Sequence, residues 1–348
     1  MTEAPVLVAR EGRAGRLTLN RPGALHALNG EMCALMTGAL LAWRDDPSVD
    51  LVLVDHAAGT RGFCAGGDIR MLADSGAGDG AEARAFFHAE YRLNHLIHSY
   101  PKPYVAVMDG VTMGGGVGIS VHGAVRIATE NTVFAMPETG IGLFPDVGGG
   151  WFLPRLQGEA GTWLALTGAR IKGEGVLSFG VATHFSPAAD LPALKAVLCA
   201  DGLRALEGLQ TEGPHMPHQD GALDPFFRFD TVEEVFAALA ADDHDWPQAQ
   251  LAALKSKSPQ TLKVALRQLR EGRRAASFAE VMAMEYRIGA RVVQRHDFLE
   301  GVRAVIVDKD NAPKWSPATL EGVTDDILDA IFVPLPADQE WTPLEGLS

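Results

Sequence analysis

The chain has 348 residues, of which 47% are hydrophobic and 21% are charged, and its formal net charge at pH 7 is −14. This length and composition allow a sizeable buried core, built as one large domain or as a domain with an appendage. The negative charge argues against nucleic acid or an anionic membrane surface as a partner.

The sequence also gives expectations about location. Three scattered cysteines are too few for a disulfide framework or a zinc site, which indicates a reducing compartment. No run approaches the roughly 20 apolar residues that a bilayer-spanning helix needs. The first seven residues have neither a basic region nor a long apolar stretch, so they do not resemble a signal or transit peptide. The default expectation is a cytoplasmic protein.

In chain order, the N-terminal half alternates strands and helices. Residues 6–20 predict two short strands around Gly12 and Gly15, and Asn29 is a candidate N-cap for the helix that follows. Further strands are predicted at residues 51–55, 104–108 and 125–128, and helices at residues 81–99, 115–122 and 161–166. This alternation predicts an α/β core.

Two glycine clusters follow predicted strands. Residues 63–70 read FCAGGDIR, and residues 113–120 read MGGGVGIS and are expected to open a helix. Glycine leaves backbone amides uncovered, and unpaired N–H groups at a helix start carry partial positive charge. One amide from each loop would therefore hold a developing oxyanion, as thioester or ester chemistry requires.

Two carboxylates stand in the apolar, glycine-rich run 134–150. Glu138 and Asp146 lie on either side of turn-forming residues, including Pro145, so the backbone can fold back and aim both side chains into one cavity. A carboxylate desolvated there would be poised as a base or a nucleophile. The alternative is a pair of buried structural acids that cap nearby loops.

Beyond about residue 200 the helical signals dominate. Residues 231–236 read as a capped helix start, Ser258 and Pro259 precede a helix at 260–271, and another is predicted over 278–296. We therefore predict a core with the catalytic site over residues 1–200 and a mainly helical region over 201–348. Residues 334–348 are expected to form a loosely ordered tail.

Several motifs together resemble the crotonase superfamily, which contains enoyl-CoA hydratases and isomerases. The motifs stand in the family's order at approximately its spacing: LNRP at 19–22, ALN at 27–29, AGGD at 65–68, GGG at 114–116 and PE at 137–138. The resemblance runs nearly end to end. It implies the family's spiral of ββα units, with a mainly helical C-terminal region.

Within the superfamily, the sequence most resembles the branch that hydrolyses 3-hydroxyisobutyryl-CoA in valine breakdown. The hydratases carry a second glutamate three residues beyond the oxyanion-hole glycine, where this chain has Gly118, and typical hydratases have glycine where this chain has Asp146. The resemblance therefore implies release of free CoA from a short 3-hydroxyacyl-CoA thioester. A hydratase or isomerase on the same fold, or a non-catalytic acyl-CoA-binding protein, stays open.

The resemblance also implies roles for single residues. The N–H groups of Gly67 and Gly115 would form the oxyanion hole. Glu138 would attack the thioester or activate water, with Asp146 as the second acid and Glu90 contacting substrate. It implies a CoA-binding set of Arg21, Ala27, Arg70 and Lys309. No metal and no cofactor besides the CoA of the substrate are expected, and a homo-oligomer is possible.

Two other candidate sites each have a simpler structural interpretation. Cys64 is a candidate thiol nucleophile, but no partner base is evident, and a small buried loop residue is the favoured interpretation. His215 and His218 could ligate a metal, yet the segment offers no third ligand at a telling spacing, so a solvated loop is favoured.

Overall fold

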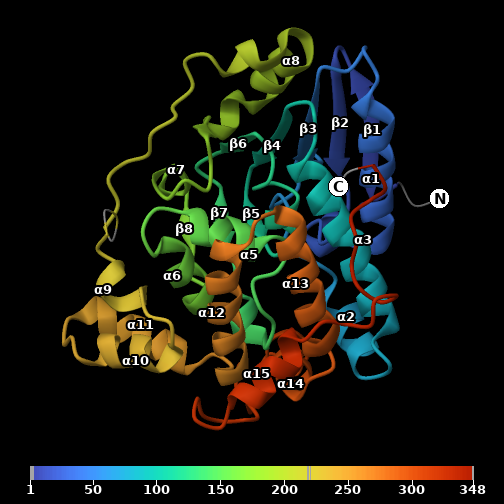
Figure 1. Ribbon diagram of the computed structural model, residues 1–348. Coiled ribbons are helices and arrows are strands. Elements are labelled where there is room, and N and C mark those ends of the chain that lie inside the picture. The colour runs from blue at the N-terminus through green and yellow to red at the C-terminus, as the bar shows by residue number, and fades with distance from the viewer. Residues whose placement is uncertain (1–3, 218, 220, 347–348) are drawn as a thin grey trace.

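The computed structural model describes residues 4–217, 219 and 221–346. Its main sheet has six strands in the order β1-β2-β3-β4-β6-β9 (Figure 1). β1 pairs antiparallel with β2, and the other neighbours run parallel. The strands are β1 (Val6–Glu11), β2 (Ala14–Leu19), β3 (Leu51–His56), β4 (Tyr104–Met108), β6 (Val125–Ala128) and β9 (His184–Phe185).

A second, small sheet has the order β5-β7-β8. The chain passes from β4 in the main sheet to β5 in the small one, and again from β6 to β7. This stepping between sheets, with helices inserted, confirms the predicted spiral of ββα units. The strands of the small sheet are β5 (Val111–Met113), β7 (Val133–Ala135) and β8 (Ile171–Lys172).

The helices of the N-terminal half mostly match their predictions. Asn29 caps the first, because its side chain accepts from the Met32 N–H at 2.9 Å. The helix predicted over 115–122 ends early, at Gly118; glycine is a poor helix former, and the Ser120 hydroxyl donates to the Gly116 carbonyl at 2.7 Å. The helices are α1 (Gly30–Arg44), α2 (Ile69–Gly76), α3 (Ala81–His98), α4 (Gly115–Gly118), α5 (Gly149–Phe152), α6 (Ala160–Thr167) and α7 (Gly175–Ser178).

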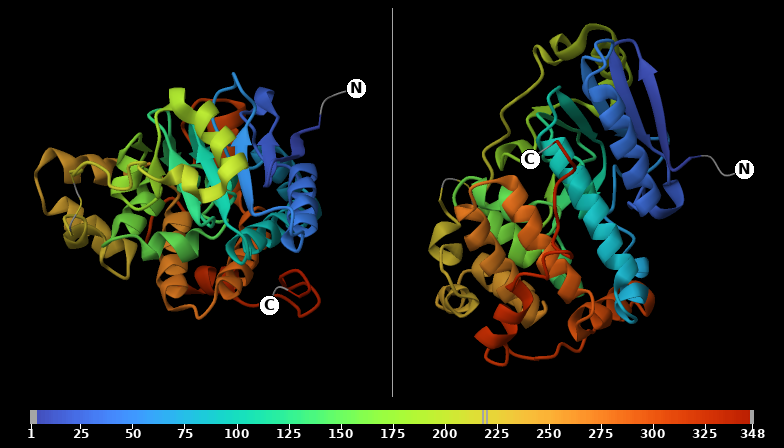
Figure 2. Two further views of the ribbon diagram at one scale, coloured as in Figure 1. Left: turned by 90° about the horizontal axis from the view of Figure 1, so that it is seen from above. Right: turned by 45° about the vertical axis from the view of Figure 1, so that its right-hand side comes forward.

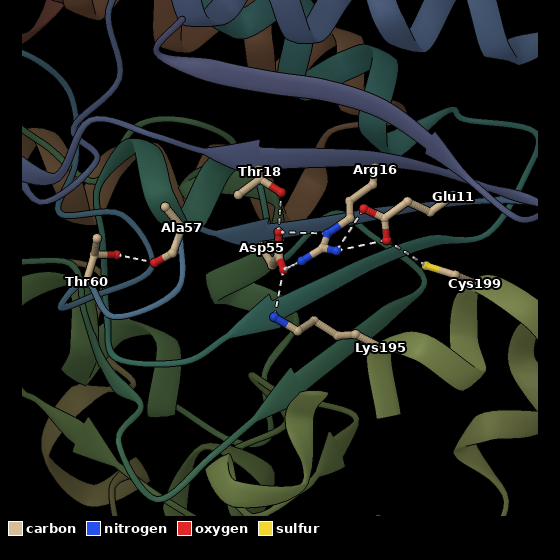
Figure 3. A network of polar contacts seen from close by, with 8 residues as sticks. All are labelled: Glu11, Arg16, Thr18, Asp55, Ala57, Thr60, Lys195 and Cys199. Atoms are coloured by element: carbon tan, nitrogen blue, oxygen red, sulfur yellow. Dashed lines mark hydrogen bonds and ion pairs between the residues drawn. The ribbon is translucent and has the colours of Figure 1, made fainter. Parts of the chain in front are cut away.

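Helix α8 (Leu191–Asp201) lies across the strands of the main sheet (Figure 2). Leu194 and Leu198 pack there on a second core that is separate from the larger one. At the rim of this contact the buried carboxylate of Asp55 accepts from Thr18 at 2.8 Å, from Arg16 Nη2 at 2.7 Å and from Lys195 Nζ at 2.8 Å (Figure 3). Ion pairs to one shared acid therefore join α8 to strands β2 and β3.

The C-terminal region is helical, as predicted. Its first long helix begins with a capping box between Thr231 and Glu234, and Ser258 accepts from the Thr261 N–H at 3.1 Å to cap α12. α12 packs on α5 and α6, and α13 packs on α3 (Figure 1). The helices are α9 (Asp224–Phe227), α10 (Val232–Ala240), α11 (Asp245–Lys255), α12 (Pro259–Arg274), α13 (Phe278–Val292), α14 (His296–Val302) and α15 (Asp325–Phe332).

The tail after α15 differs from its predicted loose order. Trp341 is buried beside His95, with ring centroids 5.8 Å apart, and Glu340 pairs with Arg287 of α13 at 2.9 Å. Its order comes from helices distant in sequence, so local composition did not reveal it. The last two residues of the predicted tail lie outside the described residues. In the described ranges, no helix combines the length and the apolar character needed to cross a membrane.

Candidate active site

The predicted catalytic residues meet in one cavity of about 80 Å³. Its walls come from both glycine loops, from α3 and from the segment 137–147, with Phe86 and Phe87 among its apolar lining residues. The cavity thus unites segments that are far apart in the sequence. The predicted site residues that line it are Gly67, Glu90, Gly115, Glu138 and Asp146.

The two glycine loops are held side by side by backbone hydrogen bonds. The Cys64 N–H donates to Val111 at 2.9 Å, and the Met113 N–H donates to Cys64 at 3.0 Å. Across the described ranges, the N–H groups of Gly67 and Gly115 donate no hydrogen bond within the protein. A Cβ on residue 115 would lie 2.6 Å from Glu90 Oε1, so a side chain there would force Glu90 to move within the cavity. Both amides are therefore available to an oxyanion in the cavity.

Glu138 opens a short 3-10 turn, η2 (Glu138–Ile141), directly after β7 and Pro137. The residue is 4% exposed, and its Oε2 has no hydrogen-bond partner within the described residues. Burial raises the pKa of this carboxyl well above its ordinary value, and the negative charge of Asp146 raises it further. Once ionised, such a carboxylate is a stronger base and nucleophile than one in water.

Asp146 has the partner that Glu138 lacks. The Tyr91 hydroxyl on α3 donates to Asp146 Oδ2 at 2.8 Å. Burial raises the pKa of Asp146 to about 7, and the bond from Tyr91 limits the rise. Sequence reasoning missed Tyr91, because a tyrosine on a predicted amphipathic helix gives no sign of a partner 55 positions away.

Glu90 adds a third acid to the same cavity. It is 2% exposed, and its Oε1 has no partner within the described residues. Burial raises the pKa of Glu90, and Asp146 raises it further. Burial and the negative charge of Asp146 therefore both disfavour the simultaneous ionisation of all three acids.

The structure explains why residue 118 carries no acid. A Cβ at Gly118 would lie 2.7 Å from Asn94 Nδ2 and 2.7 Å from Val147 Cβ. Any larger side chain there would have to displace one of these buried neighbours. The second acid of this site enters instead from the 145–150 segment, as Asp146.

The predicted CoA-binding residues do not line the cavity. Arg21 donates to the Ala27 carbonyl at 2.9 Å and pairs with Asp68 at 2.9 Å, so it braces the first glycine loop. Arg70 and Lys309 are exposed, and Arg70 donates to the Ile306 carbonyl at 3.4 Å, which brings α2 beside the segment that carries Lys309. Their binding role stays a prediction.

The structure does not support Cys64 as a nucleophile or His215 and His218 as metal ligands. Cys64 is fully buried and its thiol donates to the His26 carbonyl at 3.1 Å. Burial raises the pKa of this thiol to about 12, which argues against a thiolate nucleophile. His215 is exposed, and His218 lies outside the described residues.

Comparisons with known proteins show the family to which this chain is related. A family model described as Enoyl-CoA hydratase/isomerase matches residues 14–332. The 3-hydroxyisobutyryl-CoA hydrolase of Gallus gallus is 46% identical, covering 95% of this chain and 89% of the relative. The enzyme of the same name from Danio rerio is 47% identical, covering 94% of this chain and 89% of the relative. The predicted resemblance to this hydrolase branch is confirmed.

Solved structures give the same fold under other names. A carnitinyl-CoA dehydratase from Mycobacterium thermoresistibile has a TM-score of 0.93 at 42% identity, covering 99% of this chain and 100% of its own. An enoyl-CoA hydratase from Rhodobacter sphaeroides 2.4.1 has a TM-score of 0.89 at 40% identity, covering 97% of this chain and 99% of its own.

One prediction needs correction. The hydrolases from Gallus gallus and Danio rerio are both named as mitochondrial, which contradicts the predicted cytoplasmic location, and that prediction is wrong. It rested on the small number of cysteines, on the lack of a long apolar run and on the first seven residues not resembling a targeting peptide. The cysteine count does not decide the compartment, because a reducing environment is not peculiar to the cytoplasm.

Proposed function

Because this chain belongs to the enoyl-CoA hydratase/isomerase family, we propose that it hydrolyses the thioester of a short 3-hydroxyacyl-CoA, with 3-hydroxyisobutyryl-CoA of valine breakdown as the substrate. Relatives that are 46–47% identical over nearly the whole chain carry the hydrolase name. The small cavity, walled by Phe86, Phe87 and Leu143, suits a short acyl group.

The observation that carries the proposal is the placing of the acids. Glu138 lines the same cavity as the free amides, and its companion is Asp146, held by Tyr91, with no acid at residue 118. Hydration in this superfamily uses two glutamates that grip one water, and the second of them has no room here. The rival hydratase activity would require Asp146 to replace that glutamate.

In the proposed reaction the thioester carbonyl oxygen lies between the N–H groups of Gly67 and Gly115. As the carbonyl carbon is attacked, negative charge develops on that oxygen, and both amides stabilise it without reorganising. One such amide lowers the barrier by roughly 3 kcal/mol. The glycine loops therefore supply electrostatic stabilisation, and the acids supply the proton transfer.

Glu138 has two routes open. In one, its carboxylate attacks the carbonyl carbon, expels the CoA thiolate and forms a mixed anhydride that water then cleaves to the free acid and the carboxylate. In the other, it takes a proton from a water that attacks the carbonyl carbon directly, and that proton passes to the leaving thiolate. Both routes consume one water and release the free acid and CoA.

Turnover by the purified protein tests the proposal on two substrates in parallel. Free-thiol release from 3-hydroxyisobutyryl-CoA is followed beside the loss of enoyl absorbance of crotonyl-CoA. We expect thiol release with crotonyl-CoA left intact. Hydration of crotonyl-CoA without thiol release would establish the hydratase reading, and no turnover of either substrate would favour a binding protein.

A further inference from the structure

The segment that carries Asp146 has an unfavourable backbone. Val147, the next residue, has φ of +52°, in the left-handed region that a β-branched residue rarely adopts, and Gly148 follows with φ of +87°. A strained conformation of this kind persists only where the surroundings over-determine it. The contacts that hold residues 145–150 are therefore part of the site.

Two side chains from the C-terminal helices supply these contacts. Glu285 of α13 accepts from the Gly148 N–H at 2.7 Å with Oε2 and from the Gly150 N–H at 2.8 Å with Oε1. Gln268 of α12 donates through Nε2 to the Pro145 carbonyl at 2.7 Å and to Glu285 Oε1 at 2.9 Å. Backbone groups on both sides of Asp146 are thus bonded to one linked pair of side chains.

A third side chain completes the clamp. His122 Nε2 bonds to the Val147 carbonyl at 2.7 Å, so that carbonyl is held as well. A Cβ at Gly150 would lie 3.0 Å from Glu285 Oε1, which shows how closely the carboxylate approaches the backbone. The strained turn is therefore held from outside in addition to its own backbone bond, in which the Gly149 N–H donates to the Asp146 carbonyl at 2.8 Å.

Glu285 is a buried acid whose partners among the described residues are hydrogen-bond donors and not a cation. Its side chain is 0% exposed, and no cation pairs with it in the part of the chain that the structure describes. Burial raises the pKa of this carboxyl to about 8, and the two backbone donors limit the rise. Burying an acid without a counter-charge is unfavourable, and the N–H groups of Gly148 and Gly150 offset part of that cost. An apolar residue at position 285 would leave both of these buried donors unpaired.

We propose that Glu285, oriented by Gln268, is a positioning residue that fixes the Asp146 carboxylate at the Tyr91 hydroxyl and in the cavity. Neither Glu285 nor Gln268 lines that cavity, so both act through the backbone of residues 145–150. The inference rests on the proposed function only in that Asp146 takes part in the reaction. It extends the active site to α12 and α13, outside the N-terminal half that carries the acids of the cavity.

The test is Glu285→Gln in the full-length protein, which keeps the shape but turns one acceptor into a donor that faces a backbone N–H. We expect kcat to fall about 10²-fold, the cost of misplacing a reacting group by about 1 Å, while KM changes little. Hydrogen exchange at residues 146–151 should accelerate while exchange in the main sheet stays unchanged. Should Glu285→Gln fail to fold, Gln268→Met is the second variant, because it removes the orienting donor at nearly constant volume. We expect a smaller fall in kcat, again with KM little changed and with faster exchange at residues 146–151.

Glu159→Gln is the matched control. Glu159 is also buried, but it pairs with Arg270 and Arg273, and it does not line the cavity. We expect this variant to lose thermal stability while its kcat stays at the wild-type value. A loss of kcat in Glu159→Gln as large as in Glu285→Gln would reduce the effect to general destabilisation and overturn the proposal.

The remaining outcomes separate this proposal from the proposed function. If the wild type releases no CoA, the proposed function fails, and the exchange data alone decide on Glu285. Faster exchange confined to residues 146–151 in Glu285→Gln would then still support positioning. Unchanged exchange and wild-type kcat in that variant would overturn the positioning role while leaving the hydrolase intact.

Discussion

Two groups of buried acids in this protein have opposite surroundings. Asp55, 1% exposed, lies between Arg16 and Lys195 (Figure 3). Burial alone would raise its pKa, but the two cations outweigh burial and hold it below the ordinary value. Glu138 and Asp146 are equally buried, yet neither pairs with a cation in the described ranges, and their pKa values are raised.

The difference shows that burial by itself does not decide what an acid does. Counter-charges make Asp55 a permanent anion that fastens α8 to the sheet. Without such ion pairs, burial raises the pKa values of Glu138 and Asp146, which leaves both acids able to take part in proton transfer at a cost in stability. A substitution should therefore act mainly on stability in the first group and mainly on turnover in the second.

The largest effect is expected for Glu138→Gln. Because it removes the base or nucleophile, kcat should fall by about 10³–10⁴-fold, while acyl-CoA binding stays measurable. The melting temperature should rise, since a buried unpaired acid is lost. Steady-state kinetics, calorimetric titration with acyl-CoA and thermal melting measure the three quantities. Glu31→Gln, at an exposed position in the first turn of α1, is the control, and near-normal hydrolysis by Glu138→Gln would sink the mechanism.

Asp55→Asn should give the opposite pattern. It leaves Arg16 and Lys195 without their shared acid, so the free energy of unfolding should drop by about 3 kcal/mol, with kcat unchanged. Urea denaturation measures the drop. Asp50→Asn, which breaks only an exposed pair with Arg13, should lower the free energy of unfolding far less. Equal losses of unfolding free energy in the two variants would show that the buried ion pairs of Asp55 stabilise the protein no more than the exposed pair of Asp50 does.

The two groups should also respond oppositely to pH. The pKa of Asp146 is raised to about 7 in the folded protein. Its contribution to the free energy of unfolding is therefore most favourable below about pH 4 and is lost as pH rises towards 7. The lowered pKa of Asp55 gives stability that is present above about pH 4 and is lost as pH falls further.

Asp146→Asn tests the part of this pH dependence that comes from Asp146. Between pH 4 and 7, the unfolding free energy of this variant should fall less than that of the wild type, by roughly 2–4 kcal/mol. Urea denaturation at several pH values measures both slopes. Parallel curves would mean that Asp146 titrates normally in the folded protein.

The smallest effects are expected at the surface. Arg70→Met and Lys309→Met should each raise KM for acyl-CoA about 3–5-fold without changing kcat, since an exposed cation near a phosphate contributes about 1 kcal/mol or less. Added salt should reduce the difference from wild type. Arg204→Met removes an exposed cation elsewhere, and an equal rise in KM there would exclude a specific CoA contact.

Local sequence determined most of the fold's parts. The strands of the N-terminal half, the Asn29 cap and the capping box at Thr231 follow from residue types and spacing, because neighbouring residues alone make those interactions. The motifs likewise identified Gly67, Gly115, Glu138 and Asp146. Each belongs to a glycine-rich or apolar run that is unusual enough to stand out in the sequence.

Only the tertiary structure decided which distant residues act on those motifs. Tyr91 reaches Asp146 across 55 positions, and Glu285 reaches the Gly148 amide across 137. Neither residue stands in a pattern that names its partner, because an isolated Tyr or Glu on an amphipathic helix reads as ordinary. The sequence also did not reveal that the helix predicted over 115–122 ends at Gly118, or that Trp341 is buried. Both outcomes depend on contacts made after folding. A raised or lowered pKa likewise depends on which charges share a buried space, and only the packed chain fixes that.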